Sequence, residues 1–260
     1  MPTAELTIVI VSWNVRELLK KCLESIFENR ADLALKIIVV DNASKDQTAE
    51  MVRANFPQVK LIVNASNLGF AQANNQGIKE SQSDYILVLN PDTEIVDSAL
   101  PTVLDFMKKN EQIGIVGAKH LNPDKTLQPS VRRFPNLPVL FLIFSKIAKI
   151  FPNLKTISHY LAKDFDYQKS QPCDQAAGSF LLLRKKMLDQ IGLFDEQFFI
   201  WFEEVDLCRR AKTAGWGAWY LPTAEIIHRG GQSFSQQLTL KNQKIFFQSA
   251  YKYLKKHGLR

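Results

Sequence analysis

Three acidic residues, Glu203, Glu204 and Asp206, directly follow the aromatic stretch QFFIWF in this sequence. On a helix, Glu203 and Asp206 would share one face, whereas Glu204 would point about 100° away. One glutamate would then lie near the aromatic side chains, where burial raises the pKa of a carboxyl group and makes it a better base. Asp206 can pair with one of the two arginines that follow, which is a structural use. The acids could equally be the first turn of a helix, favoured by its macrodipole, and the residues alone leave both interpretations open.

A fourth acid, Asp92, comes after the apolar run YILVL and a proline that makes the turn rigid. Carboxylate oxygens beside a diphosphate are the ligands that Mg²⁺ or Mn²⁺ prefers, so Asp92 is a candidate metal ligand. The alternative is an Asx-turn in which Asp92 caps the next few residues of the chain. His228 ends a β-like run before two glycines, and it becomes a candidate metal or diphosphate contact if the fold brings it to Asp92. The other histidines have no supporting context and are interpreted as surface or core residues: His120, His159 and His257.

Two further segments have the composition of a nucleotide site. Asp41, in VVDNAS, follows an apolar run and can accept hydrogen bonds from a nucleobase imide or a ribose hydroxyl; the alternative is a helix N-cap network of the polar residues there. In NLGFAQANNQGI, Gly69 permits a positive φ or the close approach of a ligand, and the helix after it offers free N–H groups to an anion. A turn glycine with surface amides is the alternative. No G-x-G-x-x-G motif follows the first strand, which argues against a nicotinamide enzyme.

Strands and helices alternate through the first part of the chain. Short β-branched runs predict strands at 6–13, 36–44, 59–66 and 85–95. Helices are expected between them, at 15–29, 46–56 and 69–81. This order predicts a doubly wound parallel sheet with right-handed crossovers, in which ligands bind at the carboxyl ends of the strands. Those ends are all polar in this sequence: Ser12–Asn14, Asp41–Ser44, Asn64–Asn67 and Asn90–Asp92.

The pattern changes after residue 115. Strands or strand-to-helix junctions are expected at 113–121 and 178–188, and a helix at 238–259. The stretch LPVLFLIFSKIAKIF, at 137–151, is strongly apolar but contains two lysines and falls short of the ~20 residues that span a bilayer. It is either a buried helix or a helix lying in a membrane interface.

The overall composition is that of a globular protein. The 260 residues allow one large domain or two small ones, and neither a linker nor an internal repeat divides them. Three widely spaced cysteines indicate neither a disulfide framework nor a metal cluster. The N-terminus runs straight into a strand-like stretch and does not resemble a signal peptide, so a cytoplasmic location is expected.

Positive charge is concentrated in two regions. Residues 121–170 hold eight Lys/Arg and three Asp, and residues 236–260 hold six Lys/Arg and no acid. These regions therefore carry +5 and +6, so the rest of the chain carries −4 of the net charge of +7. Such regional charge suits an anionic partner such as a membrane surface, a diphosphate or nucleic acid. Nucleic acid is not expected as a partner, because the basic regions contain no RNA-binding motif.

Six segments, taken in order, resemble the inverting family 2 glycosyltransferases and most closely their rhamnosyltransferase-like members. The segments are IVIVSWN, VVDNASKDQT, NLGFAQANNQGI, YILVLNPDTEI, GSFLLLRKKMLDQIGLFDEQFFIWFEEVDLCRRAKTAGW and AEIIHRGGQS. The resemblance implies the α/β GT-A fold, a Rossmann-like, mostly parallel sheet with helices on both faces. Residues 1–235 would form one domain, with a nucleotide-sugar half to about 118 and an acceptor half over 119–235. Residues 236–260 would be a basic C-terminal helix packed on it.

The resemblance also implies a reaction and roles for the residues. A sugar would move with inversion from a nucleoside-diphosphate-sugar to a hydroxyl of a glycan or lipid-linked saccharide, assisted by Mg²⁺ or Mn²⁺. Asp92 and His228 would contact the metal. Glu204 would be the general base, with Glu203 and Asp206 as the other candidates. The donor nucleotide and its sugar would be bound by Ser12, Asn14, Asp41, Asn67, Gly69, Asn74, Asn90, Gly178 and Ser179.

This sequence departs from the family pattern at two positions. Asn90 replaces the first acid of the metal motif, which leaves Asp92 with more of that role, and Glu204 stands where the family usually has an aspartate. A lipid-linked acceptor would be reached by peripheral contact with the cytoplasmic leaflet of a membrane. Two alternatives stay open at this stage, a nucleotide-binding or membrane-surface module without transferase activity and a nucleotidyltransferase.

Overall fold

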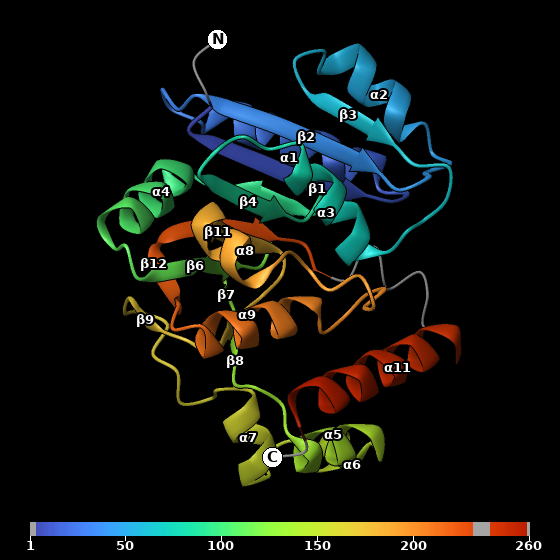
Figure 1. The fold of residues 1–260 in the computed structure, drawn as a ribbon, viewed down its shortest axis with the longest axis vertical. Helices are drawn as coiled ribbons and strands as arrows, with labels where there is room; N and C mark the ends of the chain where they lie inside the picture. Colours follow the sequence, from blue (N-terminus) through green and yellow to red (C-terminus); the bar gives the residue numbers. More distant parts are fainter. Residues whose placement is uncertain (1–3, 231–239, 259–260) are drawn as a thin grey trace.

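The computed structural model describes residues 4–230 and 240–258, and its centre is a mixed β-sheet between two layers of helices (Figure 1). The strand order is β3-β2-β1-β4-β11-β6-β12-β5. The first four strands in this order are mutually parallel: β1 (Leu6–Ser12), β2 (Leu35–Asp41), β3 (Lys60–Val63) and β4 (Tyr85–Leu89). The crossover helices are α1 (Arg16–Glu28), α2 (Thr48–Asn55) and α3 (Phe70–Lys79). The alternation expected from the sequence is confirmed over this region.

The second part of the sheet mixes strand directions. Strand β11 (Phe180–Arg184) runs antiparallel to β4 and to β6 (Ile113–Leu121). Strand β12 (Gly217–His228) is parallel to β6 and antiparallel to the short β5 (Thr93–Ile95). Helices α4 (Ala99–Lys109), α8 (Lys185–Ile191) and α9 (Glu203–Thr213) cover this part. Minor pairings involve β7 (Leu127–Gln128), β8 (Val131–Arg132), β9 (Gln171–Pro172) and β10 (Gln175–Ala176).

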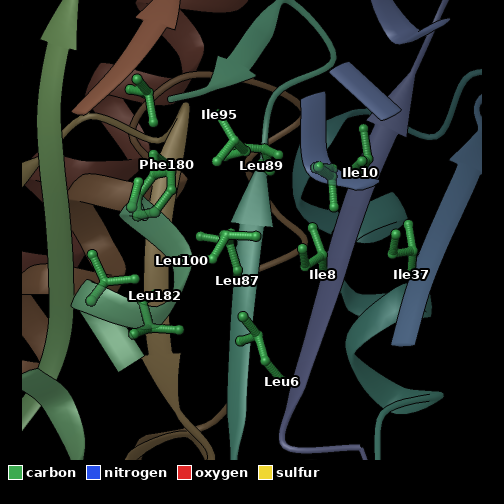
Figure 2. Close-up of a cluster of buried hydrophobic side chains, with 14 of the residues drawn as sticks. Leu6, Ile8, Ile10, Ile37, Leu87, Leu89, Ile95, Leu100, Phe180 and Leu182 are labelled. Atoms are coloured by element: carbon green, nitrogen blue, oxygen red, sulfur yellow. The ribbon is translucent and has the colours of Figure 1, made fainter. Parts of the chain in front are cut away.

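Alternating side chains of the strands fill the two layers between sheet and helices. In β1, Leu6, Ile8 and Ile10 point into one core with side chains of α1 and α4 (Figure 2). Val9 points to the opposite core, which contains side chains of α3, α8 and α9. Because both faces are covered by apolar side chains, every residue of β1 except one is buried. The sequence therefore reads as a continuous apolar run rather than an alternating one.

The apolar stretch 137–151 forms neither a single buried helix nor a single interfacial one. It folds as α5 (Leu137–Phe144) and α6 (Ile147–Ile150), separated by Ser145 and Lys146; the backbone of Lys146 is left-handed with φ 61°. Asn136 begins α5, and its side chain accepts a hydrogen bond from the N–H of Val139. Only two side chains of α5 and none of α6 are buried, so the expectation of a buried helix was wrong. No helix in the described part of the chain is long and apolar enough to cross a bilayer.

Two more helices complete this end of the molecule. They are α7 (Lys155–Tyr160) and the C-terminal α11 (Leu240–His257), which lies alongside α9 and α5 (Figure 1). Aromatic side chains join α11 to both neighbours: the ring centre of Phe246 is 5.5 Å from that of Phe202, just before α9, and 5.8 Å from that of Phe144 in α5. Helix α11 therefore packs on the body of the molecule through a small apolar cluster of its own.

Candidate active site

Helix α9 presents the three acids of its first turn in different environments. Its first residue follows Trp201 and Phe202, both in the left-handed region with φ 65° and 73°. This sharp turn ends the aromatic stretch and begins the helix that carries the acids. Glu203 and Asp206 are buried on one face, whereas Glu204 is half-buried on another. The helical spacing predicted from the sequence is therefore confirmed.

Glu204 lies against the turn that precedes β11. A β-carbon added to Gly178 would be 3.6 Å from the Cβ and Cγ atoms of Glu204, so the glutamate side chain packs directly on this glycine. Burial raises the pKa of Glu204, while the positive charge of Arg132 acts in the opposite direction. A raised pKa makes a carboxylate a stronger base near neutral pH.

Glu203 is in a less polar place. Burial raises the pKa of Glu203 well above its usual value, and the negative charge of Glu204 raises it further. Its Oε2 atom is buried without a hydrogen-bond partner in the described residues. A carboxyl group in this environment is stable in the protonated form. Of the two adjacent glutamates, Glu204 is the one whose ionised form is favoured by a nearby cation, Arg132.

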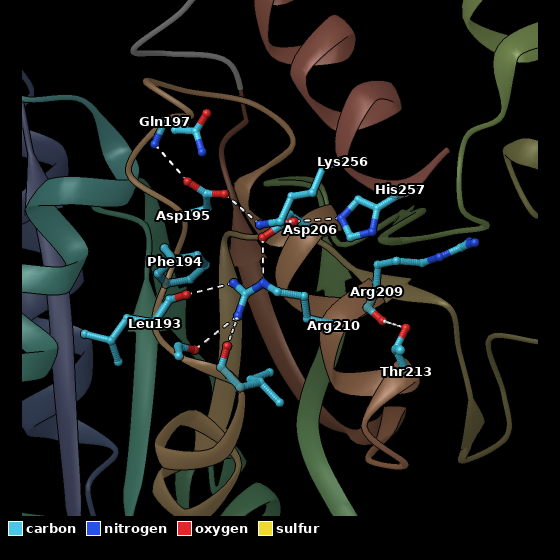
Figure 3. Close-up of polar contacts among 12 residues, drawn as sticks. Leu193, Phe194, Asp195, Gln197, Asp206, Arg209, Arg210, Thr213, Lys256 and His257 are labelled. Carbon is cyan, nitrogen blue, oxygen red and sulfur yellow. Dashed lines mark hydrogen bonds and ion pairs between the residues drawn. The ribbon is translucent and has the colours of Figure 1, made fainter. Parts of the chain in front are cut away.

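Asp206 stabilises the position of helix α9 and does not face the side of the site where a ligand could bind. It is fully buried, and Arg210 Nε donates a 2.8 Å hydrogen bond to its Oδ2 (Figure 3). Lys256 Nζ and His257 Nε2, both from α11, lie 2.8 and 2.7 Å from its Oδ1. Arg210 also donates to the main-chain carbonyls of residues 191–193. The pairing with an arginine that the sequence predicted is confirmed, whereas His257 was missed.

Asp92 and His228 meet across the sheet. His228 is the last residue of β12 and pairs in register with Thr93 of β5, the residue that follows Asp92. This pairing brings His228 Nε2 to 3.4 Å from Asp92 Oδ1, and both side chains are largely buried. The condition that the sequence placed on His228, that the fold bring it to Asp92, is met.

The tautomer of His228 is set by its other neighbour, Gln128. The amide nitrogen of Gln128 donates to Asn122 Oδ1 at 2.9 Å and to the His228 carbonyl at 3.3 Å. The Gln128 Oε1 atom must therefore accept a hydrogen bond from His228 Nδ1, at 2.7 Å. When the imidazole is neutral it has one N–H, and this bond then leaves the lone pair on Nε2, the atom that faces the Asp92 carboxylate. Two electron-rich atoms at this distance make a favourable site for a cation.

His120 lies behind this pair and was interpreted from the sequence only as a surface or core residue. It is buried in β6, with its ring centre 5.6 Å from that of His228. Its Nδ1 donates to the carbonyl of Ala118 at 2.9 Å, so its Nε2 accepts from the Ser179 hydroxyl at 2.7 Å. Burial lowers the pKa of His120 to about 3, and the neighbouring His228 acts in the same direction. His120 is therefore neutral and fixes the orientation of Ser179.

The turn at Gly178 and Ser179 joins the two groups of residues. Gly178 packs on Glu204, and Ser179 contacts His120 on the other side. The Ser179 carbonyl also accepts a 3.0 Å hydrogen bond from the Asn90 N–H, at the carboxyl end of β4. A short segment of main chain therefore links the surroundings of the half-buried carboxyl group to those of the Asp92–His228 pair.

Polar loops at the carboxyl ends of β1 and β2 are held together by their own hydrogen bonds. Asp41 Oδ1 accepts from the Ser44 N–H at 3.1 Å, and Ser44 Oγ accepts from the Asn14 N–H at 3.0 Å. Asn14 is half-buried and borders a cavity of about 500 Å³ that Arg16 and Lys45 also line. Glu17 and Asp46 line the same cavity, and Arg16 pairs with Glu17 at 2.8 Å, so the lining is polar and mixed in charge. A polar cavity at the carboxyl ends of parallel strands is a usual place for a ligand.

The loop before α3 is organised by Asn42, which the sequence suggested only as part of a capping network. Its amide nitrogen donates to Asn67 Oδ1 at 2.9 Å and to the Gly69 carbonyl at 3.2 Å. Its Oδ1 atom accepts from Asn64 Nδ2 at 3.1 Å and the Leu68 N–H at 3.0 Å. The expected capping network thus extends to the next strand end and fixes the position of Asn67.

The close approach predicted at Gly69 is made by the protein itself. Its φ is +85°, and an added β-carbon would lie 2.3 Å from the main-chain oxygen of Phe199, which also accepts from the Phe70 N–H at 2.7 Å. The aromatic stretch before α9 is thereby joined to the loop before α3.

Two predicted site residues do not face open space. Ser12 is completely buried, and its Oγ has no hydrogen-bond partner among the described residues. Asn74 is also completely buried and donates to the Phe70 carbonyl within its own helix. Ser12 and Asn74 are therefore buried beneath the adjacent loops and help to hold them in position.

The chain matches the family model described as "Glycosyl transferase family 2" over residues 7–192, which is more than half of its length. It is 27% identical over 242 residues to N-acetylglucosaminyl-diphospho-decaprenol L-rhamnosyltransferase of Mycobacterium tuberculosis, covering 89% of this chain and 78% of that protein. It is 29% identical over 230 residues to rhamnosyltransferase WbbL of Escherichia coli, covering 85% and 82%.

Solved glycosyltransferase structures share the fold. The mannosyltransferase PcManGT of Pyrobaculum calidifontis, in complex with GDP-Man and Mn²⁺, superposes with a TM-score of 0.64 at 15% identity over 97% of this chain. GalNAc-T7, solved with UDP, GalNAc and Mn²⁺, gives a TM-score of 0.62 at 17% identity over 87% of this chain. This chain spans only 65% and 44% of those two proteins. Both are glycosyltransferases of the GT-A fold, so the fold class expected from the sequence is confirmed.

Proposed function

This chain belongs to glycosyltransferase family 2, and on that premise we propose that it is an inverting, metal-assisted enzyme. The sugar comes from a nucleoside-diphosphate-sugar donor and passes to a hydroxyl group of a glycan or lipid-linked saccharide. One observation carries the proposal: a chain of direct contacts links Glu204 to the Asp92–His228 pair. Glu204 packs on Gly178, the adjacent Ser179 contacts His120, and the His120 ring packs on that of His228 beside Asp92. An in-line displacement needs a base on one side of the reacting carbon and a site for the leaving group on the other.

Glu204 is the proposed general base. It removes the proton from the acceptor hydroxyl while the acceptor oxygen forms a bond to the anomeric carbon. The bond from that carbon to the diphosphate oxygen breaks on the opposite face, so the configuration inverts and the nucleoside diphosphate leaves with the electron pair. The raised pKa of Glu204 supports this role, because proton transfer is most efficient when the pKa of the base lies near the working pH.

Asp92 and His228 fit a divalent cation. Their oxygen and nitrogen atoms are ligand types that Mn²⁺ accepts, and Gln128 holds the imidazole in the tautomer with its Nε2 lone pair free. No group of three or more His, Cys, Asp or Glu side chains in the described residues could hold a metal ion by itself, so this pair would share the ion with the donor diphosphate and water. When bound, the cation would offset the negative charge that gathers on the departing diphosphate.

The polar loops at the ends of β1, β2 and β3 are the proposed nucleotide site. Asp41 and the amide network around Asn42 present fixed hydrogen-bonding groups, and the adjacent cavity has a polar lining of mixed charge. Two relatives are named rhamnosyltransferases, and one of these names contains a diphospho-decaprenol acceptor. We therefore take a nucleoside-diphosphate-rhamnose as the first donor to test, and a polyprenyl-diphosphate saccharide as the first acceptor.

A thermal-shift titration tests the proposal, because a ligand that binds only the folded state raises the melting temperature. We expect a larger rise for a nucleoside diphosphate with Mn²⁺ than without it, and release of nucleoside diphosphate when donor and acceptor are combined. Asp92→Asn is the matched variant, since it removes one charge and keeps the side-chain shape. If it retained the full Mn²⁺-dependent shift, the metal assignment would be wrong; if no nucleotide sugar gave either shift or turnover, the donor class would be wrong.

A further inference from the structure

Helices α5, α6, α7 and α11 lie at the end of the molecule away from β1–β3 (Figure 1). Exposed apolar side chains are concentrated on these helices and on the connection between α6 and α7. Seven of the ten large apolar side chains that are exposed in the described residues lie there. We call this surface the helical end face, and it contains Leu137, Phe141, Ile150, Phe151, Leu154, Phe247 and Tyr251. The exposed fractions of Phe141, Ile150 and Phe151 are 63%, 69% and 58%. Single exposed apolar side chains are ordinary, but a concentration of this kind marks an interaction surface.

The two halves of this face touch each other. The ring centre of Phe144, in α5, is 4.2 Å from that of Phe247, in α11. The apolar side chains contributed by these distant parts of the sequence therefore belong to one surface. The short length of α5 and α6, and the left-handed break at Lys146, let this segment lie across the end of the molecule instead of entering its core.

The same elements are basic and contain no acids. Residues 125–163 include seven Lys/Arg and no Asp or Glu, and residues 240–258 include five Lys and no acid. Lys146, Lys149 and Lys155 are exposed, and none has an ion-pair partner in the described residues. Positive charge around exposed aromatic and aliphatic side chains is the pattern of a surface that binds an anionic membrane interface.

Charge decides between this partner and the alternatives. In a symmetric dimer each copy presents the same patch, so two acid-free basic faces would repel each other. Nucleic acid would satisfy the lysines but leave the side chains of Phe141, Ile150 and Phe151 in water. An anionic bilayer accommodates both, with the apolar side chains among the acyl chains and the lysines at the phosphates.

The helical end face adjoins the candidate active site. Tyr160 ends α7, and the guanidinium carbon of Arg132 lies 5.8 Å from the centre of its ring. Arg132 is in turn close enough to Glu204 for its charge to act on that carboxyl group. On the other side, Phe246 of α11 packs on Phe202, one residue before α9. A molecule anchored at this face by an apolar tail would therefore have its polar head near Glu204.

We propose that the helical end face docks this protein on an anionic lipid bilayer and presents the active site to an amphiphilic acceptor held in that bilayer. Docking itself is inferred from the exposed apolar and basic side chains. The orientation of the acceptor rests on the proposed function. Binding should require both negative lipid and low to moderate salt, because the lysine contribution is screened by ions.

Flotation of the full chain with phosphatidylcholine vesicles, with and without phosphatidylglycerol, tests the inference. We expect binding to the mixed vesicles at low salt and little binding to phosphatidylcholine alone. Lys146→Glu with Lys149→Glu should weaken partitioning about tenfold or more, because each lysine near an anionic surface contributes roughly a fivefold factor. Phe141→Ser with Phe151→Ser should have a similar effect, because both side chains are exposed and would lose their insertion into the interface.

Matched controls come from other parts of the surface. Lys21→Glu with Lys109→Glu changes the net charge equally on α1 and α4, and Val63→Ser removes an exposed apolar side chain from β3. These variants should float almost as the unmodified protein does. If the double variants on the helical end face do not fold, the single variants Lys149→Glu and Ile150→Ser give the same test with a smaller expected loss of flotation.

Three results would overturn the inference: equal flotation of end-face and control variants, no flotation with phosphatidylglycerol at low salt, or a dimer in sedimentation that Phe141→Ser abolishes. The readout is independent of catalysis, so Glu204→Gln should float normally. Loss of sugar transfer with intact flotation would count against the proposed function alone. If the unmodified protein did not float but still transferred sugar to a soluble acceptor, the result would count against this inference alone.

Discussion

His257 Nε2 lies 2.7 Å from Asp206 Oδ1, so the last turn of α11 is bound to the first turn of α9. The two residues come from helices that are distant in the sequence, and Lys256 and Arg210 complete the contacts around the same buried carboxylate (Figure 3). Because α9 begins with Glu203 and Glu204, this ionic cluster fixes the position of the proposed base from the side opposite the sheet.

Asp206→Asn should destabilise the protein by about 3 kcal/mol at neutral pH, because it leaves buried positive groups without their partner. Burial alone would raise the pKa of Asp206, but hydrogen bonds from His257 and Lys256, and the charge of Arg210, lower it to about 2. A carboxyl group with a lowered folded-state pKa stabilises the fold above its ordinary pKa of 3.8. That contribution, about 2 kcal/mol, is lost as the pH falls from about 4 through about 2.

Urea unfolding at neutral and acidic pH measures this effect. The difference between Asp206→Asn and the unmodified protein should shrink as the pH approaches 2. Asp189→Asn is the control, because the exposed Lys185–Asp189 pair should contribute within about 0.5 kcal/mol. Equal losses for the two variants would show that the cluster around Asp206 does not stabilise the fold as proposed.

Glu204→Gln should lower turnover by about 10²–10⁴ and leave the binding of donor intact, because the amide cannot accept the proton. Glu203→Gln should have a much smaller effect, since Glu203 is buried and its raised pKa already keeps it protonated. Steady-state kinetics with a calorimetric measurement of donor binding separates the two. A larger loss for Glu203→Gln than for Glu204→Gln would reverse the assignment of the base.

Gln128→Leu should weaken Mn²⁺ binding in the presence of nucleoside diphosphate by about 10- to 100-fold. The variant removes the acceptor that holds His228 in the tautomer with its Nε2 lone pair free, without touching either proposed ligand. Titration of Mn²⁺ by its paramagnetic effect on water relaxation gives the affinity directly. Asn122→Ala is the milder control, because it removes only the acceptor of the Gln128 amide nitrogen and leaves the Gln128–His228 hydrogen bond in place. An unchanged Mn²⁺ affinity in Gln128→Leu would contradict the role of the tautomer.

Gly69→Ala should destabilise the protein by about 2 kcal/mol or more, because the left-handed backbone and a steric clash act together. Its φ is +85°, and the added carbon would lie 2.3 Å from the Phe199 oxygen. Gly192→Ala is the matched control, since Gly192 has nearly the same φ, +81°, with no atom within 4 Å of the added carbon. Chemical unfolding of both variants isolates the clash, and equal losses would mean that the Phe199 contact adjusts without cost.

The sequence by itself determined the first half of the sheet. Each strand there is a short apolar run bounded by polar residues, and each helix has one apolar stripe, so local periodicity fixes the element order. Because parallel strands share one carboxyl edge, the sequence also predicted that Asp41, Asn67 and Asp92 lie at the same end of the sheet. The chemical roles of these residues stay predictions that the variants above test.

Only the tertiary structure decided how the second half completes the site. Strand β11 lies antiparallel between β4 and β6, and β12 pairs with both β5 and β6; no local pattern encodes such long-range pairings. His228 reaches Asp92 through them. They also bring His120 and Ser179 together, and periodicity gave no reason to single out that histidine.

The end of the chain gives the clearest contrast. The sequence indicated that 137–151 is apolar and that the C-terminus is basic, but it could not tell which side chains would stay exposed or that the two segments meet. That depended on the packing of Phe144 against Phe247 and on the anchoring of α11 at Asp206. Composition determined that the chain contains an apolar segment and a basic segment. Contacts between distant residues determined that these segments form one face next to the candidate active site.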